Sequence, residues 1–555
     1  MDKPWLKSYA NGVVSAVQYE RITVADALNR MAQKYPDKPA LIFLDVKITY
    51  KQLNDMVNSF ANALIDMGVK PGDKVAMLMP NMPQIVIASY GAWRAGAVVV
   101  MNNPLYTDTE LEHQLNNSES TVLVTLDLLG PRMIALKPKT PVKKIVVAHI
   151  RDHLKFPKKQ LLPIVAKDKH RDIPPTPDVF EWMDVIKKYP AADPKISVDF
   201  DSLASLQYTG GTTGVSKGVM LTHKNLSSNV QQINAWFPDF VEGEMVMLGV
   251  LPFFHSFGLT CVMNLTIWKA GTDVLIPRPE PKTILEAIHK HRINFYPAVP
   301  TIYVGLLNHP DLAKYDISSI KGCFSGAAPL PVEVIKEFES KTGSQICEGY
   351  GLSETSPVVT INPWGGKTKV GSIGLPIADT EVRIVDLEEG TKDMPQGQPG
   401  EVIIRGPQVT SGYYKMPDET AKTVKDGWLF TGDIGTMDEE GYFYIVDRKK
   451  DMIIAGGYNI YPRDIDEVLF EHPKILEACA IGVPDSYRGE TVKAFVVLKP
   501  GETMTAEEVM DYCKEKLAKY KVPTMVEFID TLPKSGVGKI LRKELRAMEL
   551  ARMKK

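Results

Sequence analysis

The chain has 555 residues, of which 44% are hydrophobic and 24% are charged. These values are typical of a globular protein and exclude a disordered or collagen-like chain, and the length predicts at least two domains. The 65 Lys and Arg nearly balance the 67 Asp and Glu, which gives no support for a nucleic-acid-binding protein. The sequence has no run of 18 apolar residues to span a membrane, no signal-peptide core and no CxxC pair among its five cysteines. We therefore expect buried, reduced thiols and a cytoplasmic protein.

Strands and helices alternate along the first part of the chain. Residues 24–68 predict helices around a short strand pair, and Thr49 is placed to cap the second helix. Buried strands then alternate with helices up to about Gly374, which indicates a mostly parallel sheet flanked by helices. The segments TVLVTLD and KIVVAHI are further strand candidates, and the Lys- and Pro-rich stretch from about Lys137 to Asp201 otherwise has the composition of surface connections.

The pattern changes twice towards the C-terminus. From Glu381 to Asp447, short strands separated by turns predict a small β-barrel-like subdomain. From Asp451 onward, two helices and three strands predict a compact α+β unit of roughly 100 residues. The predicted fold class is therefore α/β, with a large N-terminal domain and a small C-terminal domain.

The segment YTGGTTGVSKGV, Tyr208 to Val219, has the composition of a phosphate-binding loop. Glycines let backbone N–H groups approach an anion, threonine hydroxyls add donors, and Lys217 adds positive charge. The spacing excludes a Walker A loop, because no Gly-Lys-[Ser/Thr] ending follows. The alternative is a surface loop, but the segment directly follows the apolar run LASLQY, as phosphate loops in α/β proteins do.

Four further segments carry residues suited to nucleotide chemistry. Glu354 in GYGLSETSP could hold a hard cation, although a single loop glutamate is more often a surface residue. Asp433 in WLFTGDIG could hold a ribose diol or simply stabilise its turn. The segment DRKKDMIIAGGYNIYP joins a charged cluster to a strand and a Gly-Gly turn, and PKSGVGKILR places Lys539 after a Gly-rich loop.

In this order and spacing, the five segments resemble the motifs of the adenylate-forming superfamily, over nearly the whole chain. The family includes acyl-CoA synthetases, coumarate-CoA ligases, luciferases and peptide-synthetase adenylation domains. The DRKKDMI and GGYNIYP segments look most like fatty acyl-CoA ligases of the long- or medium-chain type. The resemblance implies a two-step reaction, in which a carboxylate and ATP give acyl-AMP and pyrophosphate, and the thiol of coenzyme A then gives acyl-CoA and AMP.

The resemblance also implies roles for individual residues. Lys539 would neutralise charge at the α-phosphate in the first step, and Glu354 with Thr209 would hold Mg²⁺. Asp433 would accept the ribose hydroxyls, with Arg448 nearby. The remaining nucleotide-binding residues that the resemblance implies are Gly210, Gly211, Thr212, Thr213 and Lys217 at the phosphates, Thr355 facing the α-phosphate, and Gly326, Ala327, Ala328, Glu348, Gly349, Tyr350 and Gly351 around the adenine.

For the acyl group, the resemblance points to segments that line the pocket in relatives. These hold His255, Phe257, Gly258, Val299, Thr301 and Gly326. Relatives that activate amino acids usually carry an aspartate at the position of His255, so a carboxylic acid with an uncharged tail is favoured; a histidine satisfied in the core is the alternative. Gly258 and Gly326 would leave room for an extended tunnel.

The two half-reactions also predict a moving C-terminal domain. The resemblance implies that the domains are residues 1–447, a hinge at 448–450 that includes Lys450, and a mobile domain at 451–555, with Gly456 and Gly457 at coenzyme A. Lys450 could instead be a solvated loop residue. The expected partners are a small carboxylic acid, ATP and coenzyme A, with no nucleic acid; the protein would be a monomer or homodimer that is cytoplasmic or peripheral to a membrane.

Three other functions remain as alternatives to a fatty acid–CoA ligase. The first is a ligase for aryl or branched acids, and the second transfers the acyl group to a carrier protein, which would have to be a separate chain. The third is a non-catalytic AMP or acyl sensor, against which the presence of Lys539, Glu354 and Asp433 argues.

Overall fold

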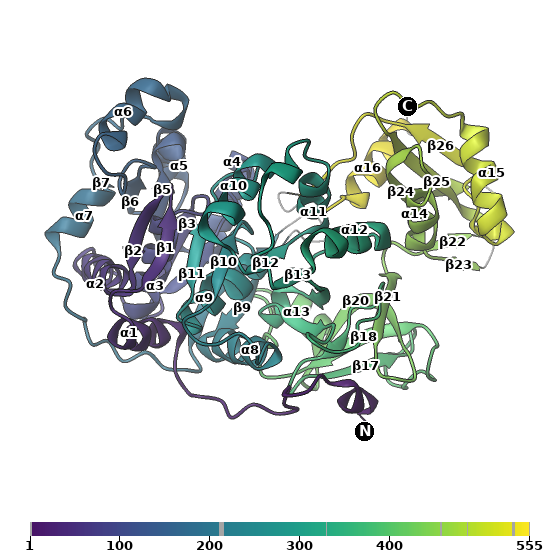
Figure 1. Ribbon diagram of the computed structural model, residues 1–555, viewed down its shortest axis with the longest axis horizontal. Coiled ribbons are helices and arrows are strands. Elements are labelled where there is room, and N and C mark those ends of the chain that lie inside the picture. Colours follow the sequence, from purple (N-terminus) through teal and green to yellow (C-terminus); the bar gives the residue numbers. More distant parts are fainter. Residues whose placement is uncertain are drawn as a thin grey trace.

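The structure, a computed structural model, describes residues 3–209, 216–328, 330–455, 458–485, 487–535 and 539–553. Its large N-terminal part contains two mostly parallel sheets flanked by helices, and a small α+β unit lies at the C-terminal end (Figure 1). The predicted fold class is therefore confirmed. Among the described residues, no helix is long and apolar enough to cross a membrane. All five cysteines are buried and unpaired, as expected.

The larger sheet has nine strands in the order β16-β15-β14-β13-β12-β10-β11-β1-β2. The six strands from β14 to β1 in this order run parallel, and the outer pairings are antiparallel. Their bounds are β1 (Pro39–Phe43), β2 (Val46–Thr49), β10 (Val246–Gly249), β11 (Thr272–Leu275), β12 (Phe295–Ala298), β13 (Gly322–Ser325), β14 (Ile346–Gly351), β15 (Val358–Ile361) and β16 (Leu375–Pro376). Strands β1, β10, β11, β12 and β13 are almost entirely buried, as expected for parallel strands covered on both faces, whereas β14 becomes exposed towards Gly351.

The second sheet has seven strands in the order β7-β6-β5-β3-β4-β8-β9. All of them run parallel except β9, which pairs antiparallel with β8. Their bounds are β3 (Lys74–Leu78), β4 (Val98–Met101), β5 (Ser120–Leu126), β6 (Lys144–Ala148), β7 (Val179–Glu181), β8 (Leu203–Thr209) and β9 (Lys217–Thr222). Residues 137–201 contribute two sheet strands. The first, β6, lies in the predicted strand segment KIVVAHI, whereas β7 lies where we expected surface connections. This stretch is rich in lysine, but it also contributes side chains to the core, such as the fully buried Trp182.

Helices pack against both sheets. In α2 (Tyr50–Asp66) the predicted cap is present, because the Thr49 hydroxyl accepts from Gln52 N and the Gln52 side chain accepts from Thr49 N. Helix α3 (Pro83–Arg94) is buried along its whole length and packs against α2 and α1 (Val24–Lys34). The other helices of this part are α4 (Asp108–Ser118), α5 (Gly130–Leu136), α6 (Lys158–Val165), α7 (Trp182–Lys188), α8 (His223–Trp236), α9 (Leu265–Trp268), α10 (Pro281–His291), α11 (Pro300–Leu307), α12 (Val332–Thr342) and α13 (Pro417–Thr423).

The turn-rich region after residue 380 forms the expected small β-subdomain. It is a five-stranded antiparallel sheet in which the ten-residue strand β20 pairs with β18, β19 and β21. Its strands are β17 (Glu381–Val385), β18 (Gly400–Arg405), β19 (Val424–Lys425), β20 (Trp428–Met437) and β21 (Phe443–Arg448).

The C-terminal unit has its own sheet and its own apolar clusters, which lie between residues 453 and 545. It lies at one end of the molecule, on the right in Figure 1. Its elements are β22 (Ile453–Ala455), β23 (Tyr458–Ile460), α14 (Pro462–Phe470), β24 (Ile475–Asp485), β25 (Gly489–Leu498), α15 (Ala506–Lys516), β26 (Met525–Phe528) and α16 (Arg542–Met553). The helices and strands predicted here from the sequence are all present.

Candidate functional site

The nine-stranded sheet contains a point where the strand order reverses. From β10 the chain proceeds to β11 on one side, and β12, β13 and β14 follow on the other side. In open α/β sheets, ligands bind beyond the carboxyl ends of the strands at such a switch point. His255 follows β10, Val299 follows β12, Gly326 follows β13, and residues 348–351 end β14. The fold therefore brings four predicted segments to one edge.

A buried carboxylate lies at the centre of this edge. Asp433 on β20 faces Arg448 on β21 in register, and its Oδ1 is 2.9 Å from Arg448 Nε. The Tyr350 hydroxyl donates to Asp433 Oδ2 at 2.6 Å. The Asp433 side chain is only 4% exposed, so these two bonds hold a negative charge in fixed position. A carboxylate oxygen can accept two hydrogen bonds, so each oxygen of Asp433 has acceptor capacity left for a hydroxyl of a diol.

Lys539 reaches the same place from the C-terminal unit, just before α16. The positive charge of Arg448, followed by burial, lowers the pKa of the Lys539 ammonium to about 8, although Asp433 acts in the opposite direction. Arg448 and Asp433 act on the ammonium, and the Lys539 residue is exposed to solvent. In the described part of the chain, its ammonium makes no ion pair with a carboxylate within 4 Å. A cation held among other cations is a strong binding group for an anion.

His255 is a neutral imidazole in this structure. Burial, with a further contribution from the Lys539 charge, lowers the pKa of His255 to about 4. The ring Nδ1 accepts a hydrogen bond from the Phe257 backbone N–H at 3.3 Å, which assigns the proton to Nε2. The Nε2–H group is therefore a donor, and His255 offers neither a positive nor a negative charge to a ligand.

Glu354 lies in the 3-10 turn Ser353–Thr355 and is half-buried. Its Oε1 accepts from the Tyr413 hydroxyl at 2.8 Å. Within the described residues, its other carboxylate oxygen makes no hydrogen bond to the protein. An oxygen of this kind suits a hard cation. Lys217 lies over the same tyrosine ring, 5.2 Å from its centroid, and its Nζ is 2.5 Å from Glu419 Oε2.

The same turn carries the hydroxyl groups of Thr355 and Ser353, which differ in burial. Thr355 is fully buried, and its hydroxyl bonds to the backbone of Leu352 within the same turn. Its predicted position at the α-phosphate stays a prediction. Ser353 is half-buried, and its hydroxyl is 3.3 Å from that of Ser256, next to His255. Ser353 is thus a site residue that our sequence reasoning missed.

The loop after β13 is tied to the end of β14. The Leu330 N–H donates to Glu348 Oε1 at 3.1 Å, and burial raises the pKa of Glu348 to about 7. Ala327 has a φ of 70°, a left-handed conformation that is uncommon for alanine and frequent at functional sites. A Cβ on Gly349 would lie 2.3 Å from the Phe324 ring, so only glycine fits there.

The segments predicted for the acyl group lie side by side. Phe257 packs edge-on against Phe324, with ring centroids 5.3 Å apart, and a Cβ on Gly326 would be 3.3 Å from the Phe257 ring. Val299 is buried, whereas Thr301 on α11 is exposed. Gly258 has a different reason for being glycine than the one we expected. A Cβ there would lie 2.2 Å from the Pro252 carbonyl oxygen, so this glycine allows backbone packing and does not leave room for a tunnel.

A tight turn connects the two parts of the protein. After β21 ends at Arg448, the N–H groups of Asp451 and Met452 both donate to the Arg448 carbonyl, at 2.9 and 3.1 Å. Lys450 lies inside this turn and is exposed. Asp447 links the two sides, because its carboxylate accepts from Arg448 N at 2.7 Å and from Arg463 N at the start of α14 at 2.8 Å.

Comparisons with known proteins match this geometry. The AMP-binding enzyme family matches residues 28–414, and the C-terminal domain of AMP-binding enzymes matches residues 464–539. The chain belongs to the AMP-binding enzyme family. It is 48% identical over 547 residues to a long-chain-fatty-acid–CoA ligase of Bacillus subtilis, which covers 98% of this chain and 97% of that protein.

Solved structures of the family also resemble this chain. ATP-bound MatB from Rhodopseudomonas palustris is 31% identical and has a TM-score of 0.84, covering 95% of this chain and 99% of that one. Apo MatB from the same organism, at 30% identity and with the same coverage, has a lower TM-score of 0.74. The arrangement of this AMP-binding enzyme is thus closer to the nucleotide-bound form than to the apo form.

The structure describes only part of the predicted phosphate loop of this AMP-binding enzyme. Thr209 ends β8, where it pairs in register with Lys217. The predicted phosphate-loop residues Gly210, Gly211, Thr212 and Thr213, and the predicted coenzyme A residues Gly456 and Gly457, lie outside the described residues. Their roles stay predictions.

Tyr413 was also missed from the sequence. It bonds to Glu354 and supports Lys217, which are both far from it along the chain. Asp447, the first residue of the predicted segment DRKKDMIIAGGYNIYP, bonds to residues on both sides of the turn.

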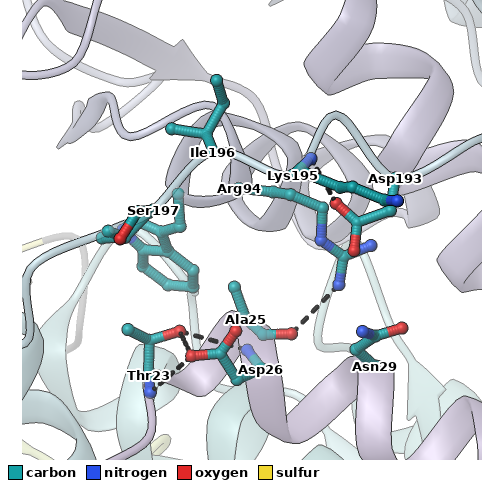
Figure 2. A pocket seen from close by; sticks show the side chains of 11 residues that line it. Thr23, Ala25, Asp26, Asn29, Arg94, Asp193, Lys195, Ile196 and Ser197 are labelled. Atoms are coloured by element: carbon teal, nitrogen blue, oxygen red, sulfur yellow. Dashed lines mark hydrogen bonds between the residues drawn. The ribbon is translucent and has the colours of Figure 1, made fainter.

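A separate cavity of about 210 Å³ lies between α1, α3 and residues 193–198 (Figure 2). Arg94 extends into it, and its guanidinium donates to Asn54, Asn58 and the Ala25 carbonyl. Asp26 on the opposite wall is bonded to Thr23 in a capping box. These bonds occupy the charged groups of Arg94 and Asp26, and we assign no ligand to the cavity.

Proposed function

We propose that this protein is an ATP-dependent, AMP-forming long-chain fatty acid–CoA ligase. The observation that carries the proposal is the position of Lys539, a cation without an acidic partner among the described residues, beside Asp433 and Arg448 at the sheet edge. The similarity to the Bacillus subtilis long-chain-fatty-acid–CoA ligase supports the choice of substrate.

In the first step, a carboxylate oxygen of the acid attacks the α-phosphorus of ATP, and pyrophosphate leaves. Attack by one anion on another requires neutralisation of charge, which Lys539 would supply. Asp433 would accept the ribose hydroxyls, and Arg448 would hold that carboxylate in place. Glu354, with its free oxygen, would bind Mg²⁺ together with Thr209, and the ion would neutralise phosphate charge.

In the second step, the coenzyme A sulfur attacks the acyl carbon, and AMP leaves with the electrons of the broken C–O bond. We propose that the C-terminal domain then moves about Lys450 and withdraws Lys539, since the thiol needs access to the same centre. The greater similarity to ATP-bound than to apo MatB supports an arrangement suited to the first step.

The neutral state of His255 favours an acid without a charged tail, because an uncharged imidazole is no ion-pair partner for an amino group. We include in the proposal a cytoplasmic location with peripheral membrane contact, as a monomer or homodimer. A ligase for aryl or branched acids, and transfer to a carrier protein, remain as the second candidates on the same scaffold.

The test is an assay of coenzyme A consumption and AMP release over straight-chain acids of increasing length, with aryl and branched acids alongside. We expect AMP, pyrophosphate and thioester in equal amounts, with long-chain acids preferred. Preference for an aryl acid would replace the substrate class. Formation of ADP, or absence of any acid-dependent ATP–pyrophosphate exchange, would overturn the proposed function.

A further inference from the structure

The connection between β6 and β7 forms an arm, which we define as residues 150–171. The arm includes α6 and projects from the end of the molecule opposite to the C-terminal unit, at the upper left of Figure 1. Seven of its residues are Lys or Arg and two are Asp, whereas the whole chain has a net charge of −2. The positive charge is therefore concentrated on the arm.

The arm also exposes apolar side chains. Phe156 is 81% exposed and Leu161 on α6 is 47% exposed, between the exposed lysines Lys155, Lys158 and Lys169. Asp152, one of the two acidic residues, is buried and accepts hydrogen bonds from His149 N and Gln84 Nε2. The outer surface of the arm thus carries apolar and cationic side chains, with Asp168 as its exposed acidic residue and with Lys158 Nζ 3.8 Å from Asp45 Oδ2.

A buried cluster fastens both ends of the arm. Asp127, which follows β5, accepts from His149 Nδ1 at 2.8 Å, immediately before the arm begins. The same carboxylate oxygen accepts from His170 Nδ1 at 3.0 Å and from Arg171 N at 2.9 Å, where the arm ends. The base is held to the core, so the exposed tip is presented on a fixed support.

We propose that this arm docks the enzyme on a bilayer that contains anionic lipids. Exposed aromatic and aliphatic side chains flanked by lysines match the boundary between headgroups and acyl chains, where apolar groups insert and cations meet lipid phosphates. Two protruding apolar side chains are too few for the buried centre of a protein interface but suffice for shallow insertion. Docking would bring the enzyme to fatty acids dissolved in the membrane. This benefit rests on the proposed function, whereas the docking itself does not.

Co-sedimentation with vesicles tests the proposal without ATP, acid or coenzyme A, so its result is independent of the proposed activity. We expect the wild-type chain to bind phosphatidylcholine vesicles containing about one third phosphatidylglycerol, and to be released by high salt. The double variant Phe156→Ser, Leu161→Ser should lower the partition coefficient by about tenfold or more, because inserted apolar surface is lost. The double variant Lys155→Glu, Lys169→Glu should lower it about tenfold by removing the attraction to anionic lipid.

Matched controls lie elsewhere on the surface. Tyr487→Ser removes an aromatic side chain that is 95% exposed on the C-terminal unit, and Lys70→Glu, Lys282→Glu reverses the same number of exposed lysines outside the arm. Neither control should change the partition coefficient more than about twofold. Equal thermal unfolding temperatures for all variants would confirm that folding is intact.

A probe on the arm gives a second readout. Because the five native cysteines are buried, Phe156→Cys can be labelled selectively with an environment-sensitive fluorophore. Its emission should shift to the blue with anionic vesicles, and the same label at Tyr487→Cys should not respond. The proposal is overturned if the wild type does not bind these vesicles, if it binds neutral vesicles equally well, or if the arm variants bind as the wild type does.

Discussion

The carboxyl edges of the two large sheets gather charged residues in different ways. At the seven-stranded sheet, His149 Nδ1 and Nε2 bond to Asp127 and Glu181 at 2.8 and 2.7 Å. At the nine-stranded sheet, Lys539 makes no ion pair within the described residues and has a lowered pKa beside Arg448. A charge whose partners are all supplied by the protein stabilises the fold, whereas a charge left without its partner is available to a ligand.

The cluster at the seven-stranded sheet has the residue types of a metal site but not its bonding. The ligand atoms of Asp127, His149 and His170 lie within 4.8 Å of one another. Both nitrogens of His170 are bonded to carboxylates, to Asp127 and Asp172, as are those of His149. Partners within the protein therefore already occupy these ring nitrogens. We therefore interpret this cluster as structural.

Lys539→Ala should have the largest effect, because it removes the cation that we assign to the α-phosphate. We expect adenylation to fall by about 10²–10³, the usual loss for one preorganised transition-state group. Thioester formation from presynthesised acyl-AMP and coenzyme A should be nearly unchanged. The measurement is acid-dependent ATP–pyrophosphate exchange beside the second half-reaction.

Lys534→Ala is the matched control, since Lys534 lies in the same segment but its Nζ is paired with Glu477 at 2.5 Å. It should leave both half-reactions within about twofold of the wild type, as expected for a surface ion pair. If Lys539→Ala slowed both half-reactions equally, our assignment of Lys539 to the first step would be wrong.

Asp127→Asn should produce the opposite pattern. Removing the buried charge that holds His149 and His170 should lower the free energy of unfolding by about 3 kcal/mol. Adenylation per folded molecule should not change, because the cluster belongs to the other sheet. Urea unfolding measures the free energy of unfolding, and pyrophosphate exchange measures adenylation.

Asp172→Asn is the matched control, because its carboxylate is 96% exposed on the far side of His170. It should lower the free energy of unfolding by less than about 1 kcal/mol. A specific loss of adenylation in Asp127→Asn would remove the distinction between the two edges.

Lys450→Pro tests how the unpaired cation is delivered and withdrawn. Proline fixes φ and removes an N–H, but the N–H of Lys450 makes no hydrogen bond in the described part of the chain. We expect adenylation to be largely retained and thioester formation to fall by at least about tenfold, since the hinge can no longer rotate. Both half-reactions should be measured on one preparation.

Lys449→Pro provides the contrast. The N–H of Lys449 donates to the Gly432 carbonyl at 2.8 Å, so proline there breaks an existing bond beside Asp433 and should impair both half-reactions. If Lys450→Pro left thioester formation intact, the pivot would lie at another residue.

The difference between the two edges also explains what could be predicted from the sequence. Asp433, Arg448, Glu354 and Lys539 were predicted because their short segments resemble family motifs, since composition alone left their roles open. The fold brings these residues to one place. The alternation of strands and helices likewise predicts the parallel sheets, because the connection lengths and apolar runs are local.

Groups that act through distant partners could not be predicted. His149 and His170 lie 22 and 43 positions after Asp127, and no motif in the sequence relates the three residues to one another. Gly258 illustrates a related limit. The sequence shows that a side chain is absent, but only the structure shows that the Pro252 carbonyl occupies that space. Short sequence motifs can identify candidate ligand-binding residues. Hydrogen-bond networks and close backbone packing depend on which elements lie side by side, and a single segment does not show this.

The smallest expected effect is a pH dependence of stability that His149 contributes. Burial alone would lower the pKa of His149, but the bonds to Asp127 and Glu181 outweigh burial and raise the pKa to about 9. Asp152 and the His170 ring, whose centroid is 5.3 Å away, complete the groups that face it. Because the pKa is higher in the folded than in the unfolded chain, the stabilisation is fully present below about pH 6.5 and is lost as the pH rises through about 9. The free energy of unfolding of the wild type relative to His149→Gln should therefore fall by about 1–3 kcal/mol between these pH values. Urea unfolding of both chains across this range measures the difference, and parallel curves would show that His149 is not charged in the folded protein.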